Sequence, residues 1–436
     1  MNGLKSFILV LQLVLLLITG SANAITTVHK ADQEISTTLI AGSKDAIFNG
    51  RASYTFNVKN ATDVPQTGTV SYIAVTPTGV TVAKESRKVN LSKHSSASYD
   101  FTVPEQKPGF YKVNFMINVS DYDDTTRRVF GIRPEEIQSQ HGRPADFDSF
   151  WQNTKSELAT VKPQFKMTEK AEQETENRKV YLIEMRSLDN ITVRGWLTIP
   201  KTSIRNRRFS TLLALPGYQV DLKPMLGEDN DIAIITLNVR GQGNSRDVIH
   251  PKRPDYISLN AEDKNKYVLR GAIMDCIRAI DFIYSRPELD PKRIEVSGGS
   301  LGGFLAAAVA GLDNRVQLVS SQNPILSDIR NLPDQEDWPL YDLHKYAGEK
   351  GIKFDKILDN LDYFDIKNFA QNIQIPILLG IGLLDHLAPP NNEYAFYNLI
   401  PQKHRGIMVF KDLGHEVPMT YVLKDGHMMR DKFGLF

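Results

Sequence analysis

A glycine-bounded serine between an apolar strand and an apolar helix constrains this chain more than any other feature. Arg293–Ser297 reads as a short buried strand and Phe304–Ala310 as a helix. Between them, Gly298-Gly299-Ser300-Leu301-Gly302 has the pattern G-x-S-x-G, whose small residues permit the sharp turn that exposes a serine. The helix that follows presents unpaired N–H groups where an oxyanion would form. We predict Ser300 as a nucleophile, with a plain Gly/Ser turn as the alternative.

The elements around this turn predict an α/β fold. Val180–Met185 and Val193–Ile199 read as an antiparallel pair of strands. Continuous apolar runs indicate parallel strands buried on both faces. They are Thr211–Leu215, Ile232–Leu237, Val316–Ser320, Pro376–Ile381 and Ile407–Phe410. With helices between them, the order predicts an open, mostly parallel, doubly wound sheet over residues 135–436. The charged and aromatic segment from Pro324 to Asp362 interrupts the order and is a candidate cap or oligomer contact.

Partners for the serine are expected at the carboxyl ends of later strands, where open α/β sheets bind ligands. Asp385 follows the apolar run that begins at Ile377, and His415 follows the last strand. The order Ser300, Asp385, His415 is the one that the α/β-hydrolase topology requires. Asp385 would fix the tautomer of His415. A loop-capping aspartate and a solvated histidine are the alternatives, and Asp412 and Asp328 are weaker candidates for the acid.

Two loops complete the predicted site. The loop at Tyr218 follows an early strand, so its backbone N–H could join that of Leu301 as an oxyanion donor. Arg240-Gly241-Gln242 follows the next strand, and Arg240 is expected to organise the loops without joining the chemistry. Gly298 and Gly302 are expected to shape the serine turn. We predict no metal site, because His386 and His404 lack ligand spacing and the carboxylates form no compact cluster.

The N-terminal part differs in character. An apolar run, Phe7–Ile18, follows Lys5 and precedes the small-residue motif Ala22-Asn23-Ala24, which predicts a cleaved signal peptide over residues 1–24. Residues 25–134 alternate apolar and polar residues in short runs such as Ala52–Val58 and Tyr111–Val119. We therefore predict an immunoglobulin-like β-sandwich there, as a spacer, a docking module or a carbohydrate-binding module.

Charge and cysteine content narrow the partners and the compartment. The chain has 436 residues and a formal net charge of +1, which falls to zero without the signal segment because Lys5 is its only charged residue. A neutral balance argues against nucleic-acid and membrane partners. The single cysteine, Cys276, lies on the apolar face of a helical pattern, so no internal disulfide is expected. An exported chain without disulfides indicates a secreted or periplasmic bacterial protein.

About two-thirds of the chain, from about Arg143 to Glu416, resembles the acetyl xylan esterase and cephalosporin C deacetylase family, which is carbohydrate esterase family seven. The resemblance rests on Arg240-Gly241-Gln242, the glycine-bounded Ser300, His415-Glu416 and linking stretches. These stretches are Arg270–Ala272, Ser285–Pro291 and Ile381–Asp385. The resemblance implies a serine esterase that deacetylates small sugars or xylooligosaccharides. It also implies the triad Ser300, Asp385 and His415, with oxyanion donors at Tyr218 and Leu301. Family members are often ring-shaped hexamers, so the resemblance implies a possible homo-oligomer, although the additional N-terminal domain could block that assembly.

Two residues depart from the family pattern. Leu301 stands where the family usually has Gln, and Pro216 where it usually has His. A backbone donor survives a side-chain change, so both departures bear on substrate preference and rate. We predict a carbohydrate acetyl esterase that works through an acetyl-enzyme without a cofactor. The alternatives are another serine hydrolase of the same fold, such as a peptidase or a longer-chain esterase, and a non-catalytic glycan-binding relative.

Overall fold

The N-terminal strands form two sheets that pack over an aromatic core. The computed structural model describes residues 35–227, 229–249, 255–333 and 338–435; the predicted signal peptide lies outside them. The first sheet has the order β1-β3-β6 and the second the order β2-β8-β7-β4-β5. Their strands are β1 (Ile35–Ala41), β2 (Ile47–Phe48), β3 (Ala52–Asn60), β4 (Gln66–Val75), β5 (Thr81–Leu91), β6 (Ser95–Val103), β7 (Gly109–Val119) and β8 (Tyr122–Ile132).

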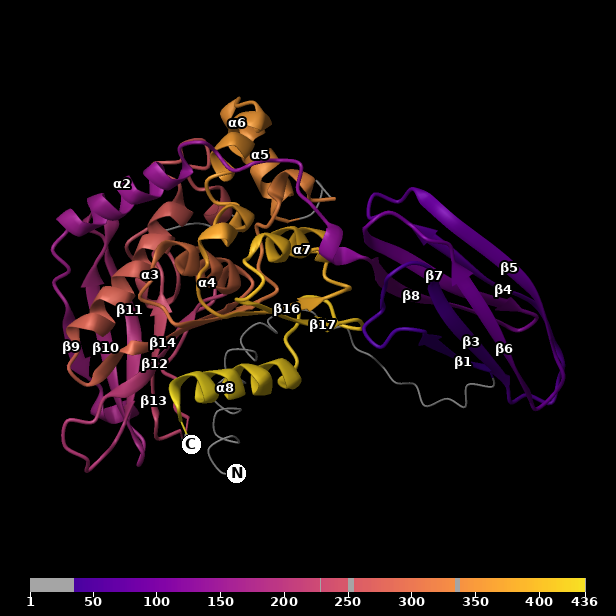
Figure 1. The fold of residues 1–436 in the computed structure, drawn as a ribbon, viewed down its shortest axis with the longest axis horizontal. Helices are drawn as coiled ribbons and strands as arrows, with labels where there is room; N and C mark the ends of the chain where they lie inside the picture. Colours follow the sequence, from indigo (N-terminus) through magenta and orange to yellow (C-terminus); the bar gives the residue numbers. More distant parts are fainter. Residues whose placement is uncertain (1–34, 228, 250–254, 334–337, 436) are drawn as a thin grey trace.

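Apolar side chains at alternate positions of these strands face the space between the two sheets and pack against each other there. Tyr54 of β3 and Phe115 of β7 come from different sheets, and their ring centroids lie 4.9 Å apart. Tyr72 of β4 and Phe101 of β6 make a second such pair at 5.5 Å. Aromatic pairs at these separations add to the burial of apolar surface. The two sheets therefore share a set of buried aromatic side chains, and the region stands to one side of the rest of the chain (Figure 1).

The remainder is built on one nine-stranded sheet of order β17-β16-β15-β14-β12-β13-β11-β10-β9. The first six strands in this order, β17-β16-β15-β14-β12-β13, pair in parallel with their neighbours. Strands β11, β10 and β9 add antiparallel pairs at one edge. The strands are β9 (Lys166–Glu169), β10 (Arg178–Arg186), β11 (Thr192–Pro200), β12 (Phe209–Leu215), β13 (Ile232–Asn238), β14 (Leu289–Gly299), β15 (Leu318–Gln322), β16 (Ile377–Gly382) and β17 (Arg405–Phe410). The mostly parallel sheet predicted from the apolar runs is confirmed.

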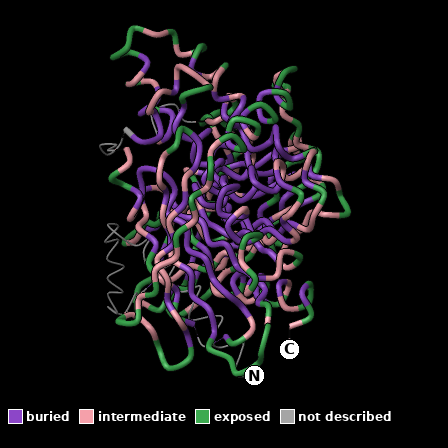
Figure 2. Tube along the Cα trace, turned by 90° about the vertical axis from the view of Figure 1, so that its left-hand side faces the viewer, coloured by how far each residue is buried: buried purple, intermediate pink, exposed green. Residues whose placement is uncertain are grey.

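Helices cover both faces of this sheet. They are α2 (Phe147–Thr160), α3 (Val268–Ser285), α4 (Leu301–Leu312), α5 (Leu340–Lys350), α6 (Phe354–Leu361), α7 (Pro390–Leu399) and α8 (Met419–Phe433). In Figure 1, α3, α4 and α7 lie on one side of the strands and α8 on the other. The most completely buried segments lie in the middle of the molecule, and exposed segments lie at its rim (Figure 2). In the described ranges, no helix has the length and apolarity that crossing a bilayer needs.

Candidate active site

Ser300 occupies a strained turn between the central strand β14 and helix α4. Its backbone has φ 59° and ψ −119°, a conformation that a residue with a side chain rarely adopts. A Cβ on Gly298 would lie 2.5 Å from the carbonyl carbon of Gly302, so the turn closes only because both residues are small. The Ser300 N–H donates to the Gln322 carbonyl of β15 at 2.8 Å. The predicted strand, turn and helix are all present, and the structure holds the serine at the carboxyl end of the sheet.

The two loops that were expected to supply oxyanion donors lie against each other. A Cβ on Gly302 would lie 2.5 Å from the carbonyl oxygen of Leu215, which precedes the Tyr218 loop. A Cβ on Gly217 would lie 3.7 Å from the carbonyl oxygen of Gly299. Leu301 is the first residue of α4, so its N–H has no partner inside the helix. The serine turn and the loop of Tyr218 therefore meet, as the proposed oxyanion hole requires.

Asp385 and His415 are in direct contact. His415 Nδ1 lies 2.7 Å from Asp385 Oδ2, and the Asp385 side chain is fully buried. The other carboxylate oxygen, Oδ1, accepts the backbone N–H groups of Leu387 and Ala388, each at 2.9 Å. These two donors fix the carboxylate so that Oδ2 faces the imidazole. A carboxylate held in this way orients a histidine and stabilises its protonated form.

The loops that carry Asp385 and His415 are fastened to each other through their backbones. Leu384 N–H donates to the Leu413 carbonyl at 2.9 Å, and Leu383 N–H donates to the Phe410 carbonyl at 3.0 Å. A Cβ on Gly382 would lie only 2.1 Å from the Gly414 carbonyl oxygen. The close approach of the two loops thus depends on a glycine at the end of β16. This contact was not predicted from the sequence, because it joins residues about thirty positions apart.

The second ring nitrogen of His415, Nε2, is the atom that would take the proton of Ser300. Nε2 is buried and makes no hydrogen bond to any described residue, Ser300 included. Catalytic hydrogen bonds are often long in enzymes without substrate and tighten when substrate binds. The structure therefore fixes the Asp385–His415 half of the predicted triad and places Ser300 in its strained turn, with the Ser300–His415 contact not made.

The two weaker candidates for the acid have other partners. Asp412 forms an ion pair with Arg128 at 3.3 Å and a second ion pair with Lys411. Asp328 accepts a hydrogen bond from the Ser139 hydroxyl at 2.5 Å and lies 3.0 Å from Lys367 Nζ. Neither carboxylate is paired with His415. Of the three acids considered, Asp385 is the one that the structure joins to the histidine.

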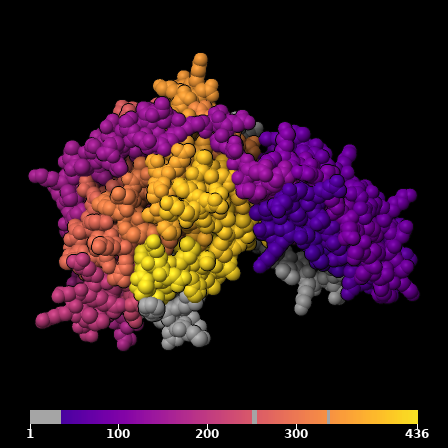
Figure 3. Space-filling model, in the orientation of Figure 1, coloured from indigo at the N-terminus to yellow at the C-terminus, as the bar shows by residue number. Residues whose placement is uncertain are grey.

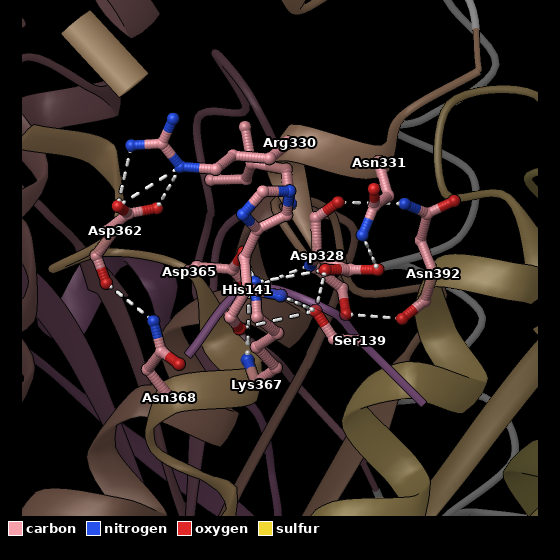
Figure 4. A network of polar contacts seen from close by, with 12 residues as sticks. Ser139, His141, Asp328, Arg330, Asn331, Asp362, Asp365, Lys367, Asn368 and Asn392 are labelled. Carbon is pink, nitrogen blue, oxygen red and sulfur yellow. Dashed lines mark hydrogen bonds and ion pairs between the residues drawn. The ribbon is translucent and has the colours of Figure 1, made fainter. Parts of the chain in front are cut away.

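The network around Asp328 connects the segment after the β-sandwich to the α/β sheet (Figure 4). Asp365 accepts the N–H groups of Asp328 and Ile329, both at 2.8 Å, and pairs with Lys367 at 2.8 Å. Burial alone would lower the pKa of Lys367, but the carboxylates of Asp365 and Asp328 outweigh it and raise that pKa. Asn392 Nδ2 donates to the Asp328 carbonyl at 3.0 Å, which ties α7 into the same network.

Arg240, which was expected to organise the loops, binds two carboxylates from other parts of the chain. Its guanidinium bonds both oxygens of the buried Asp275, at 3.0 and 2.8 Å, and Asp189 at 3.1 Å. Burial opposes its charge, but Asp275 and Asp189 outweigh that cost and raise its pKa. Gly241 adopts φ 79°, and Gln242 is buried beside it. The sequence could not reveal Asp275 as the partner, since it lies on α3, 35 residues away.

Glu393, on the first turns of α7, is a buried acid that the sequence analysis missed. Neither of its carboxyl oxygens has a hydrogen-bond partner among the described residues. Burial raises its pKa well above the ordinary value, and the negative charge of Asp385 raises it further. Its protonated form is therefore favoured, and Asp385 is the acid that contacts His415. In the sequence, Glu393 looks like an ordinary acidic residue at a helix start.

The segment that was predicted as a cap or an oligomer contact reaches the loop of Tyr218 through Trp338. The ring of Trp338 lies 4.9 Å from the ring of Tyr218, edge to face. The Tyr218 hydroxyl accepts the Ile257 N–H at 3.3 Å. Helices α5 and α6 follow Trp338 and stand out from the sheet in Figure 1. Within the described ranges, no group of three or more His, Cys, Asp or Glu residues is arranged to hold a metal ion.

The strand order, the antiparallel β11 and the placement of Ser300, Asp385 and His415 after β14, β16 and β17 define a serine hydrolase of the α/β-hydrolase fold. Comparison with known families gives the narrower assignment. The model of the acetyl xylan esterase family matches residues 133–429, and the chain belongs to that family. The resemblance stated from the sequence is therefore confirmed, and the chain is an esterase.

Individual relatives agree with this assignment. The acetyl esterase Axe7A of Xylanibacter ruminicola is 26% identical over 342 residues, which is 73% of each chain. The structure of an acetyl xylan esterase from a Paenibacillus species superimposes with a TM-score of 0.62 at 26% identity, covering 69% of this chain and 98% of that one. That of acetyl xylan esterase 1 from a Thermoanaerobacterium species gives 0.59 at 24% identity, covering 66% and 96%, and shows the shared fold.

Proposed function

We propose that the chain is an exported serine esterase that removes O-acetyl groups from xylooligosaccharides or other small acetylated sugars. The observation that carries this proposal is the 2.7 Å contact between His415 Nδ1 and Asp385 Oδ2, at the carboxyl edge of the sheet that also holds the strained Ser300. Family membership supports an acetyl ester of a carbohydrate as the substrate class.

In the proposed mechanism, Ser300 Oγ attacks the acetyl carbonyl while His415 Nε2 takes its proton. Asp385 stabilises the imidazolium through Nδ1. Backbone N–H groups of Leu301 and Tyr218 stabilise the oxyanion, which then collapses as the sugar oxygen leaves with the proton from His415. Water, activated by the same histidine, next hydrolyses the acetyl-enzyme to acetate and free serine. In each step His415 takes a proton and then returns it, and water supplies the second nucleophile, so the reaction requires no cofactor.

Several further proposals come from the sequence. The segment over residues 1–24 would direct export, and a cysteine count of one suits a bacterial periplasm. The two N-terminal sheets support an immunoglobulin-like accessory domain over residues 25–134, followed by an esterase domain over 135–436. The partner is a small acetylated carbohydrate, without nucleic acid or membrane, and a homo-oligomer stays a prediction from the family resemblance.

The test is acetate release from acetylated xylooligosaccharides by the mature protein and by Ser300→Ala. Loss of a triad nucleophile costs about 10⁶ in kcat in a well-studied serine protease, so we expect release by the variant to fall below detection. Ser156→Ala is the matched control, because Ser156 is exposed on α2 and its hydroxyl donates to the carbonyl of Gln152. This control should release acetate at the unmodified rate.

Other substrates separate this proposal from its rivals. Esters of increasing acyl length and peptide amides should be turned over less well than acetyl esters. Preference for a long acyl chain or for an amide would replace the proposed activity with that of another serine hydrolase of the same fold. Binding of xylooligosaccharides without turnover of any ester would instead indicate a non-catalytic relative. Leu301 and Pro216 would then be the first positions to change.

A further inference from the structure

The N-terminal sandwich touches both loops that carry the Asp–His pair. Arg128 of β8 forms its ion pair with Asp412, three residues before His415. Phe110 of β7 donates its N–H to Asn391 Oδ1 at 2.9 Å, at the start of the helix that follows the Asp385 loop. The ring of Phe110 also lies 5.3 Å from that of Tyr394. In Figure 3 the sandwich lies directly against the C-terminal part of the molecule.

A cavity of about 520 Å³ lies between these two parts of the molecule. From the sandwich it is lined by the β4–β5 turn and by strands β7 and β8, including Thr78, Tyr111, Lys112, Asn114 and Arg127. From the sheet it is lined by the loop after β16, including Leu383, Leu384, Asp385 and His386. Its size falls in the range of small-molecule sites, which are typically about 300–1,000 Å³. The cavity thus adjoins the acid of the proposed triad and exists only because the sandwich is present.

The sandwich wall of this cavity is cationic. Asn114 and Arg127 face each other across β7 and β8, and Lys112 is two residues from Asn114 on the same outer face. Among the described residues, no carboxylate lies within ion-pair distance of Lys112 or Arg127, whereas Arg128 is committed to Asp412. The single acid in the lining, Asp385, is buried and directed at His415. Two positive charges therefore face the cavity without a partner in the protein.

We propose that this interdomain cavity is a binding subsite for an acidic sugar unit, a uronic acid, of the acetylated glycan. This proposal rests on the proposed function, which supplies the carbohydrate substrate. What is new is that one sugar unit is acidic and that it binds in this cavity. Arg127 presents the planar donor fork that binds a carboxylate in a bidentate manner, and Lys112 adds a second charge. Asn114 and Thr78 offer neutral donors and acceptors for hydroxyl groups.

The first test measures binding without turnover. A xylooligosaccharide with one uronic acid branch is compared with the same compound whose carboxylate is reduced to an alcohol, by calorimetry on Ser300→Ala protein. We expect the acidic form to bind about tenfold more tightly, the ratio that one charge-assisted contact of ordinary strength provides. The preference should shrink as salt is raised, because this cavity is open to water.

Variants assign the preference to the cavity. Lys112→Gln with Arg127→Gln, in the Ser300→Ala background, should bring the two ligands to within about twofold of each other. Lys88→Gln is the matched control: Lys88 is an exposed lysine on the same outer face of the same sheet, on β5, and does not line the cavity. It should keep the full preference. A circular dichroism spectrum identical to that of the parent confirms that the double variant is folded.

Separate outcomes overturn the subsite and the esterase. Equal binding of the acidic and reduced ligands, or a preference that survives the double substitution, would overturn the subsite whatever the activity of the enzyme. A preference that disappears in the double variant, in a protein that releases no acetate from any carbohydrate, would support the subsite and overturn the proposed esterase. Loss of the preference with Lys88→Gln as well would show a general charge effect and would also overturn the subsite.

Discussion

At the scale of single residues, the site depends on which atom each side chain leaves available. Asp385 uses one oxygen to accept two backbone N–H groups and the other to hold His415 Nδ1. Burial and the nearby Asp385 raise the pKa of Glu393, whereas Asp385 itself contacts His415. Because Oδ2 is the single atom of Asp385 that contacts His415, even a conservative change at Asp385 should be damaging.

We expect Asp385→Asn to lower kcat by about 10⁴, the loss seen when the triad aspartate of a serine protease is changed to asparagine. The amide oxygen would keep the N–H groups of Leu387 and Ala388, so its NH₂ group would face His415. That group donates, which forces the imidazole into the tautomer with a proton on Nε2 and removes its basic nitrogen from the serine. Acetyl-ester hydrolysis at saturating substrate measures the effect.

Asp412→Asn serves as the comparison, because Asp412 is an exposed acid on the loop of His415 that pairs with Arg128 and Lys411. Surface ion pairs contribute about 0–1 kcal/mol, so this variant should stay within a few-fold of the unmodified rate. Equal losses from the two substitutions would contradict the assignment of Asp385 as the acid.

At the scale of elements, the sequence predicted the sheet and the serine turn because their signals are local. A continuous apolar run marks each parallel strand, and the glycines around Ser300 mark the turn. The sequence analysis did not name β5, whose charged run Lys84–Lys88 carries little apolar alternation. Val316–Ser320 was predicted as a strand, and β15 spans Leu318–Gln322, two residues later.

Contacts between distant elements could not be predicted in the same way. The Arg240–Asp275 pair, the Lys367–Asp365–Asp328 network and the cationic wall of the cavity each join separate strands, helices or loops. A single sequence states which residues are charged but not which of them meet after folding. The contact between Asp385 and His415 was an exception, because the α/β-hydrolase topology itself specifies which strand ends meet.

The close approach of two loops gives a prediction at the scale of elements. We expect Gly382→Ala to reduce kcat by about 10² or more, because a displacement of about 1 Å in catalytic geometry can cost that much. The added Cβ would lie 2.1 Å from the Gly414 carbonyl oxygen, so the His415 loop must move away from Asp385. Ester hydrolysis and the melting temperature are measured together to separate misplacement from unfolding.

Gly406→Ala provides the control on the neighbouring strand. Its Cβ would meet Ile377 and Leu378 at 3.6 Å, an ordinary contact. Activity and melting temperature should therefore stay near those of the unmodified enzyme. If Gly382→Ala kept full activity, the contact between the two loops would not be needed to hold the Asp–His pair.

At the scale of the whole molecule, the sheet is covered by different elements on its two faces. The sandwich and α7 meet the loops at its carboxyl edge, and α8 covers the face opposite α3 and α4 (Figure 1). Beneath α8, Asp425 lies beside Glu295 of β14, the strand that carries Ser300, and both carboxyls are fully buried. The Tyr421 hydroxyl, also from α8, donates to the Leu378 carbonyl at 2.9 Å. Two buried acids therefore sit at the joint between α8 and the sheet.

These acids predict how global stability depends on pH. Burial raises the pKa of Asp425 to about 6 from 3.8, and burial together with the charge of Asp425 raises that of Glu295 well above its ordinary value. The folded state therefore keeps a proton that the unfolded chain loses near pH 4. The stabilisation is fully present below about pH 4 and is lost as pH rises through about 6, by a few kcal/mol at most.

The measurement is the free energy of unfolding in urea between pH 4.5 and 7.5 for the unmodified protein and Asp425→Asn. The neutral amide does not titrate, so the difference in stability between the two proteins should shift in favour of the variant as pH rises through about 6. Asp431→Asn, at an exposed acid on the same helix, should follow the unmodified protein at every pH. A difference between Asp425→Asn and the unmodified protein that stays constant across this range would show that Asp425 is ionised in the folded state throughout. The joint between α8 and the sheet would then have to hold a buried charge, and α8 would be the place to look for the cation that balances it.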